Sequence, residues 1–227
     1  MSETKERRTV VKTVKNAILY SDGTVLLQNV IFSYPNVLEP KPTFNDAGQE
    51  TGSSYSLTCL MPKDTHDEAK QLLVGIINTM LKENNKGVKL AAKFKFVKNG
   101  DPTDEDDMGK PENAGRWVVS TRESKPPIVL DNKRDPNTGK TRRLNPDRPA
   151  DKDIIYGGCI GNALIRPWWQ DNKYGKRVNA GLSVVQFVKD GEPFGSGRIR
   201  DDDIDNDEAF NVVDDGDGVP DAAYDDL

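Results

Sequence analysis

The sequence predicts a mainly β fold, a small and partly open barrel capped by one helix. About six to eight segments of the chain are rich in β-branched and aromatic residues or alternate between apolar and polar residues, which is typical of half-buried strands. Residues 65–84 instead repeat their apolar side chains with the spacing of a helix. Many short strands around a single helix are typical of a barrel.

The first strands are expected before the helix. Residues 17–20 and 24–34 predict a hairpin, because a Ser-Asp-Gly turn lies between them and Pro35 can end the second strand. Residues 40–52 are polar and contain Pro, Asn and Gly, which predicts a loop. Residues 54–61 alternate and predict a strand with one buried face.

The predicted helix has recognisable ends. Thr65 followed by Glu68 indicates a capping box at its start, and Gly87 is suited to its end. Its apolar stripe could bind a partner, but packing against the sheet is far more common, and we predict that role. The only histidine, His66, is expected at the surface in the first turn.

The chain after the helix predicts a further strand and two loops. Residues 88–97 alternate, so Lys93 and Lys95 are expected on the open face of a half-buried strand. Residues 99–114 predict an acidic loop. Residues 131–153 are polar without apolar periodicity, so this insertion is expected to be either functional or disordered.

The remaining strands complete the barrel. Residues 116–122 and 128–130 predict two strands. Residues 154–169 and 177–188 predict a final hairpin, and the glycines early in its first strand indicate a bulge or a tight bend.

The net charge of −5 is unevenly distributed along the chain. Residues 201–227 contain twelve Asp and Glu and no Lys or Arg, so residues 1–200 hold 32 basic and 25 acidic residues, a net charge of +7. We predict a flexible basic arm over residues 1–16, a basic folded body over residues 17–198 and a disordered acidic tail over residues 199–227. A body of this charge is suited to a polyanionic ligand.

Composition excludes several classes of protein. One histidine, His66, and two distant cysteines, Cys59 and Cys159, provide no zinc motif, so no metal or cofactor is expected. Sparse cysteines in apolar segments are typical of a reduced, intracellular protein. No apolar run approaches the length of a signal core or a membrane span, so we expect a cytosolic protein.

The densest candidate site is an aromatic and basic segment, residues 166–177. Aromatic faces can stack on unpaired bases while Lys and Arg contact phosphates. Adjacent strand residues point to opposite faces, so one tryptophan of the Trp168-Trp169 pair is expected to face the ligand, and the sequence leaves open which one. The candidate residues here are Arg166, Trp168, Trp169, Lys173, Tyr174, Lys176 and Arg177.

A second group of candidates is more widely spread. Trp117 could belong to the core or stack on a base, and the lysines of residues 88–97 could simply face water. The basic residues of the 131–153 insertion could order on a nucleic acid or only keep a disordered loop soluble. The candidates of this group are Tyr34, Lys93, Lys95, Arg116, Trp117, Arg122, Lys125 and Arg143.

The acidic tail contains spaced hydrophobic residues. It could keep the protein soluble, dock a partner protein, or lie in the basic groove of the body and compete with a nucleic acid. The candidate partner-binding residues are Phe210, Tyr224, Asp225, Asp226 and Leu227.

Residues 116–125, 156–163 and 181–187 resemble a family of phage-encoded OB-fold single-stranded DNA-binding proteins, and the acidic C-terminal segment is similar to theirs. The resemblance implies an OB-fold, a five-stranded, partly open Greek-key barrel, with extra hairpins and the one helix. It implies a non-enzymatic protein that coats and protects single strands in phage DNA replication, recombination and repair, in the cytoplasm of an infected bacterium. It also implies a tail that recruits phage or host replication proteins, although this tail ends in Leu227 where related proteins often end in phenylalanine.

The residues themselves leave other functions open. The ligand could be RNA, because no residue pattern indicates a pocket for a 2′-hydroxyl group. The protein could be a phage adaptor that acts through its acidic tail, or a metal-dependent nuclease that uses the acidic runs. The predicted partner is a single-stranded nucleic acid, and no membrane or small-molecule substrate is expected.

Overall fold

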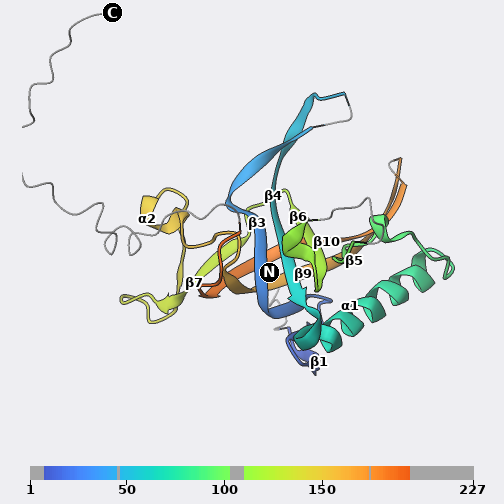
Figure 1. Ribbon diagram of the computed structural model, residues 1–227, viewed down its shortest axis with the longest axis horizontal. Coiled ribbons are helices and arrows are strands. Elements are labelled where there is room, and N and C mark those ends of the chain that lie inside the picture. Colours follow the sequence, from blue (N-terminus) through green and yellow to red (C-terminus); the bar gives the residue numbers. More distant parts are fainter. Residues whose placement is uncertain (1–7, 45–46, 103–109, 174, 195–227) are drawn as a thin grey trace, which may run out of the picture. The chain divides into compact units, whose positions relative to one another are not determined.

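Ten strands, one long helix and three short helical turns make up residues 8–44, 47–102, 110–173 and 175–194, which the computed structural model describes (Figure 1). The strands are β1 (Val10–Val14), β2 (Ala17–Tyr20), β3 (Val25–Phe44), β4 (Glu50–Pro62), β5 (Val97–Asn99), β6 (Arg116–Glu123), β7 (Ile128–Arg134), β8 (Thr141–Arg143), β9 (Ile160–Asn172) and β10 (Gly175–Lys189). The helices are α1 (Lys63–Asn84) and α2 (Pro149–Lys152), and the 3-10 turns are η1 (Ala92–Phe94) and η2 (Pro111–Asn113).

The strands form one curved sheet in the order β5-β6-β4-β3-β9-β10-β7-β8, and β1 and β2 extend it beside β3. The neighbouring strands are antiparallel except β10 and β7. Curvature brings β6 near β10, but these two strands share no hydrogen-bonded ladder in the described part of the chain. A single parallel bridge, Lys95 with Val178, joins the segment before β5 to β10. The predicted mainly β, partly open barrel is confirmed, and it is consistent with an OB-like fold.

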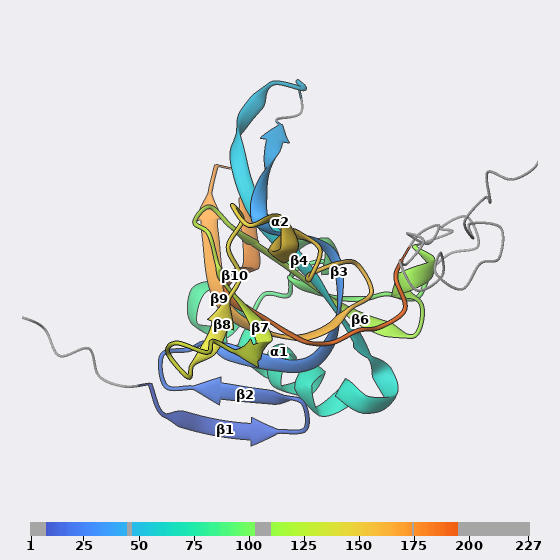
Figure 2. The same cartoon turned by 90° about the vertical axis from the view of Figure 1, so that its left-hand side faces the viewer.

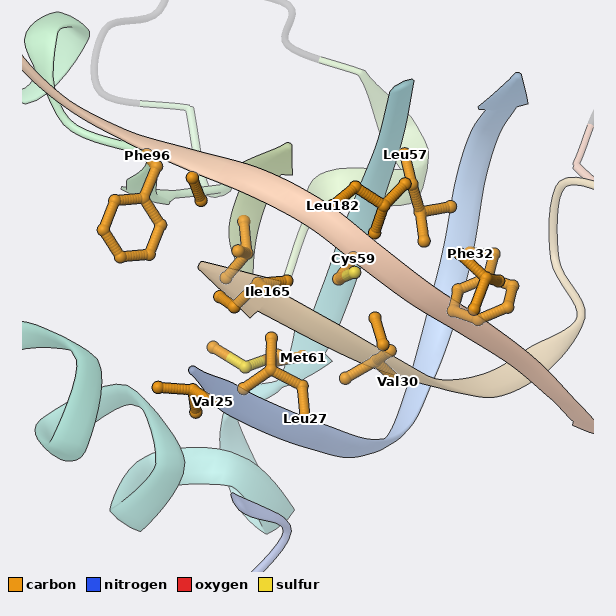
Figure 3. Close-up of a cluster of buried hydrophobic side chains, with 14 of the residues drawn as sticks. Val25, Leu27, Val30, Phe32, Leu57, Cys59, Met61, Phe96, Ile165 and Leu182 are labelled. Atoms are coloured by element: carbon orange, nitrogen blue, oxygen red, sulfur yellow. The ribbon is translucent and has the colours of Figure 1, made fainter. Parts of the chain in front are cut away.

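Apolar side chains from the long strands fill the barrel. On β4 the predicted alternation is confirmed, since Leu57, Cys59 and Met61 are all buried. Gly161 on β9 lets the Phe32 ring approach closely, because a Cβ atom at this glycine would lie 2.2 Å from Phe32 Cζ. Figure 3 shows the centre of this core, where side chains of β3, β4, β9 and β10 meet.

Both cysteine thiols are buried in this interior and unpaired. Burial raises the pKa of Cys59 to about 12 and, as the chief cause, that of Cys159 to about 11. A thiol with such a pKa stays protonated at neutral pH and behaves as a small apolar side chain.

Two regions in the N-terminal part of the chain are more ordered than the sequence predicts. Val10–Val14, assigned to a flexible arm, form β1 and pair with β2. The predicted hairpin of β2 and β3 is confirmed, but its second strand does not end at Pro35 and continues to Phe44. The loop predicted over residues 40–52 is wrong, because its two sides pair as the ends of β3 and β4, with Thr43 opposite Gly52. This ribbon projects from the body in both views (Figures 1 and 2).

The prediction for residues 88–97 is also wrong. Val88 is exposed, residues 92–94 form η1, and only Val97 begins a strand, β5. The predicted lysine row therefore does not exist as one strand face. The 131–153 insertion is ordered, since it contains the end of β7, the strand β8 and the short helix α2.

The predicted helix is confirmed as α1, which packs its apolar stripe against the barrel. The capping box is wrong, because the helix starts at Lys63 and Glu68 instead accepts a hydrogen bond from the Lys15 N–H at 3.1 Å. Gly87 ends the helix as predicted, with a φ of 76° and an N–H bonded to the carbonyl of Leu81. No helix within the described residues has the length and apolar character needed to span a membrane.

His66 is not at the surface, where it was expected, but is 2% exposed. Its Nε2 lies 3.0 Å from the carbonyl oxygen of Gln28, which can only accept, so Nε2 carries the proton. Its Nδ1 then accepts from the Thr65 hydroxyl at 2.8 Å. Burial, the largest cause, lowers the pKa of His66 from its usual 6.5.

We expect His66 to make the folded state less stable as the pH falls from 7 to 5. In the unfolded chain the His66 side chain binds a proton as the pH falls past 6.5. In the folded chain, where its pKa is lowered, the same side chain binds a proton only at a lower pH. As the pH is lowered, the free energy of unfolding should therefore decrease, by at most about 1.4 kcal/mol per pH unit. Urea unfolding of the wild-type protein and of His66→Gln at several pH values measures this. Because the chain has one histidine, an equal slope in both proteins would contradict the assignment.

Candidate nucleic-acid interface

The two adjacent tryptophans of β9 lie on opposite faces of the strand, as the alternation predicted. Trp168 points outward and is 43% exposed. Trp169 points to the other face and packs against the core. The question that the sequence left open is thereby answered in geometric terms, since Trp168 is the tryptophan available to a ligand.

Two arginines flank Trp168 on the outer face of the β9–β10 hairpin. Directly opposed residues of antiparallel strands share a face, and Trp168 is opposed to Asn179 and Gln170 to Arg177. Asn179 Nδ2 donates to Gln170 Oε1 at 2.8 Å, which confirms this shared face. Arg166 lies two residues before Trp168 and is exposed, so the indole stands between two cations.

The flanking arginines are held by neighbouring groups. The Arg166 guanidinium lies 3.7 Å from the Asp22 carboxylate. The Thr24 hydroxyl is the main cause of the lowered pKa of Asp22, and Arg166 lowers it further, so Asp22 remains ionised beside the arginine. The Arg177 guanidinium lies 5.3 Å from the centre of the Phe94 ring.

The structure brings Lys93 and Lys95 to this hairpin by a different route from the predicted strand. Lys95 is bridged to Val178 of β10, and the Lys93 ammonium lies 5.2 Å from the Phe94 ring, which also contacts Arg177. These lysines therefore add positive charge beside β10, in the gap between β10 and β6.

The turn of the hairpin is only partly described. Lys176 Nζ donates to Asn85 Oδ1 at 3.0 Å and lies 3.7 Å from the Asp171 carboxylate, so it is tied to the end of α1. Lys173 lies in the turn, and Tyr174 lies outside the described residues.

Of the two interpretations of Trp117, the structure favours the core. The ring packs against buried apolar residues and lies under the ammonium groups of Lys63 and Lys70, at 4.6 and 4.5 Å from its centre. Its indole Nε1 is buried and has no acceptor among the described residues. Met61 is its cross-strand partner on the inward face.

The outer face is polar and basic where β6 pairs with Ser56 and Thr58 of β4. Arg122, opposed to Ser56, is exposed there, and Lys125 is exposed in the turn that follows. Arg116 is less free, because its guanidinium donates to the carbonyl of Glu112 and lies 5.9 Å from the Phe194 ring.

Tyr34 lies at the base of the β3–β4 ribbon and is 55% exposed. Its φ of 47° is unusual for a tyrosine and coincides with a register shift between β3 and β4. The ammonium group of Lys110 lies 3.9 Å from the centre of its ring. A cation stacked on an exposed ring is an arrangement that could hold a base and its phosphate.

The sequence did not indicate two basic residues that lie near Arg116 and Tyr34. Lys98 on β5 is opposed to Val118 and is exposed on the same side of the sheet as Arg116, while Lys110 contacts Tyr34. Lys98 could have been found only with the correct start of β5, and no pattern pointed to Lys110.

The other predicted residues lie apart from these groups. Arg143 is on β8, four strands away from β3 in the sheet order. The tail residues Phe210, Tyr224, Asp225, Asp226 and Leu227 lie outside the described residues.

Comparison with known proteins gives the family. A family model described as the single-stranded DNA-binding protein of Enterobacter phage Enc34 matches residues 23–215. The solved structure of the bacteriophage Enc34 single-stranded DNA-binding protein in complex with single-stranded DNA has 40% identity and a TM-score of 0.69, covering 84% of this chain and 99% of that chain. The solved structure of a C-terminal truncation of the same protein has 39% identity and a TM-score of 0.68. It covers 83% of this chain and 98% of the truncated chain.

A curated phage protein is also similar. Protein p50 of Acyrthosiphon pisum secondary endosymbiont phage 1 is 27% identical over 183 residues, which is 77% of this chain and 88% of that protein. The family model covers most of the chain, and the resemblance seen in the sequence is confirmed. The chain belongs to the phage single-stranded DNA-binding protein family that is represented by the Enc34 protein.

Proposed function

We propose that this chain binds single-stranded DNA without reading its sequence and coats it during phage DNA replication, recombination and repair. The observation that carries this proposal is Trp168, a large aromatic side chain exposed on a strand face between two arginines. Such a ring has an apolar body that is better covered than left in water. As in its family, the chain acts by binding and not by catalysis.

The binding mode follows from the chemistry of the outer face. Bases stack on Trp168 and Tyr34, because every base has a π-face and stacking tolerates any sequence. Phosphates contact the arginines and lysines that surround these rings, mainly Arg166, Arg177 and Arg122. Each neutralised phosphate releases counterions, so the logarithm of the affinity should fall with log salt by about 0.7 per contact.

Tryptophan fluorescence titrated with oligo-thymidine at two salt concentrations tests the proposal. We expect quenching that weakens at the higher salt, because stacking and phosphate contact then occur together. Absence of binding at low salt would overturn the function. Competition between matched DNA and RNA oligomers separates the two ligands, and tighter binding of the RNA would favour the RNA-binding alternative instead.

We also propose that the acidic tail competes for the DNA-binding face and, when displaced, docks replication proteins of the phage or its host in the bacterial cytoplasm. Phe194, the last described residue, has its ring 5.9 Å from the guanidinium of Arg116 on β6, and the acidic residues of the tail are complementary in charge to the basic body. Hydrophobic residues such as Phe210 and Leu227 would supply the partner contact.

Deleting residues 201–227 is expected to tighten binding to single-stranded DNA about tenfold at low salt, because twelve competing negative charges are lost. The matched control keeps the length of the tail and replaces its Asp and Glu with Asn and Gln. We expect this control to bind as tightly as the deletion. Unchanged affinity in both variants at low salt would refute competition by the tail.

A further inference from the structure

The turn of the β7–β8 hairpin is held by its own hydrogen bonds. The Asp135 carboxylate accepts the N–H groups of Asn137 and Thr138, both at 2.9 Å, and the Asp135 N–H bonds to the carbonyl of Lys140 at 2.8 Å. These hydrogen bonds to backbone N–H groups, led by that of Thr138, lower the pKa of Asp135. The turn is thus organised by its own acidic residue, which is engaged with backbone groups.

The charges of this hairpin divide into a paired set and an unpaired set. Arg142 is bound to Asp131 and Asp151 on the inner side. The other four basic side chains are exposed, and within the described residues none of them has a carboxylate at ion-pair distance. These four are Lys133, Arg134, Lys140 and Arg143.

Arg143 shares the outer face of the sheet with Trp168. It is opposed to Leu130, which is opposed to Gln186, and Gln186 is opposed to Asn162. Asn162 Nδ2 donates to Gln186 Oε1 at 3.0 Å, which places both on one side. Asn162 and Trp168 are six residues apart on β9 and therefore also point to one side.

The separation between Trp168 and Arg143 is too large for one nucleotide but suits a longer strand. Six residues of β9 span about 20 Å, and the three strand spacings from β9 to β8 span roughly 15 Å. Measured along the curved sheet, the two places are therefore about 25 Å apart, whereas consecutive nucleotides of a stacked strand are about 3.4 Å apart.

The chemistry of the hairpin differs from that around Trp168. Residues 131–153 contain no Phe, Tyr or Trp, so this surface offers cations without a ring on which a base can stack. A surface of that kind contacts phosphates only.

We propose that Arg134, Lys140 and Arg143 form a second, phosphate-only binding surface that holds a single strand extending beyond the Trp168 region. This inference rests on the proposed function, since it extends the same strand across the same face. The hairpin then adds affinity for long strands and nothing for strands that end near Trp168.

The experiment compares the wild-type protein with the triple variant Arg134→Gln, Lys140→Gln and Arg143→Gln. Affinity is measured over a series of salt concentrations for oligo-thymidines of about 5 and about 30 nucleotides. For the long strand we expect the salt slope to fall by about 2, at about 0.7 per lost phosphate contact. For the short strand we expect no change.

The matched control removes three charges elsewhere, with Lys12→Gln, Lys15→Gln and Lys82→Gln, and should preserve the slope for both strands. Wild-type slopes in the triple variant for both lengths would overturn the inference, while binding of the short strand would still support the proposed function. The decrease in salt slope could also vanish when residues 195–227 are deleted from both proteins. That result would show that the hairpin binds the acidic tail and not DNA, and it would equally overturn the inference.

Discussion

Replacing Arg142 with methionine should lower the free energy of unfolding by about 3–5 kcal/mol, the cost of leaving buried charges without their partner. Arg142 Nε and Nη2 donate to Asp131 Oδ2 at 2.9 and 2.8 Å, and Nη1 donates to Asp151 Oδ1 at 2.6 Å. The two carboxylate side chains are 3% and 1% exposed, and once Arg142 is removed the nearest cation left to Asp151 in the described residues is Arg148, at 3.9 Å. One side chain therefore joins β8 to β7 and α2.

A neighbouring residue provides the control. Arg143 follows Arg142 on β8 but is exposed, so Arg143→Met should change the free energy of unfolding by no more than about 0.5 kcal/mol. Urea unfolding measures both variants. If they lose equal stability, charge pairing is not what orders this insertion. Adding Asp131→Asn and Asp151→Asn to Arg142→Met should reduce the loss, because the uncompensated charges are then removed.

The stability difference between Arg142→Met and the wild-type protein should shrink in acid. Burial favours a raised pKa for Asp151, but the Asn145 N–H and the Arg142 guanidinium outweigh burial and lower the pKa below its usual 3.8. The stabilisation from this carboxylate is present above 3.8 and is lost as the pH falls through the lowered value. Without Arg142 the pKa of Asp151 rises, so its protonation costs the folded variant less than it costs the wild-type protein. The free energies of unfolding of Arg142→Met and of the wild-type protein should therefore converge as the pH falls through 3.8, and a constant difference would contradict the assignment.

Regular patterns of apolar residues were sufficient to predict most strands and the helix. The alternation over residues 54–61 and the helical stripe over residues 65–84 each describe a face that is in fact buried. Such patterns fail where order has another source. The 131–153 insertion has no apolar periodicity, and the Arg142 ion pairs hold it instead. A sequence does not show which carboxylates an arginine will meet.

Prolines and local alternation explain two other errors. Pro40 and Pro42 suggested a loop, but a proline is tolerated in a ribbon with unpaired edges, and β3 continues through both. Residues 88–97 alternate as a strand would, yet only Phe96 and Val97 near their end are buried, and Leu90 is partly buried against the core. Alternation shows which residues could share a face, and it does not show whether another element covers that face.

The same limit applies to the candidate site. Strand alternation correctly placed Trp168 and Trp169 on opposite faces but did not identify the covered one. For Trp117 the structure favours the core through its packing against buried residues, with Lys63 and Lys70 over its ring. Contacts between distant segments decide which aromatic rings are free, and those contacts are absent from a local pattern.

Replacing Trp168 with alanine is the second large effect that we expect. Loss of one stacking platform should weaken binding of oligo-thymidine about 10- to 100-fold, equivalent to about 1–3 kcal/mol. The ring is exposed and outside the core, so the free energy of unfolding should change little. Trp168→Phe, which keeps an aromatic face, should recover most of the affinity. Affinity is measured by fluorescence anisotropy of a labelled oligonucleotide, which does not depend on the protein's own tryptophans.

Trp169 provides the contrast that separates stacking from folding. Because its ring packs against the core, Trp169→Ala should lower the stability of the protein and leave the affinity of the remaining folded fraction nearly unchanged. Fluorescence provides an independent measure, since quenching by DNA should survive in a Trp117→Phe, Trp169→Phe background and disappear in Trp168→Phe. If Trp168→Ala bound oligo-thymidine as tightly as the wild-type protein at every salt concentration, base stacking would have to occur elsewhere, and Tyr34 beside Lys110 would be the next candidate. Phosphate contacts alone cannot mask the loss of Trp168, because stacking depends little on salt, so the ratio of the two affinities should persist at every salt concentration.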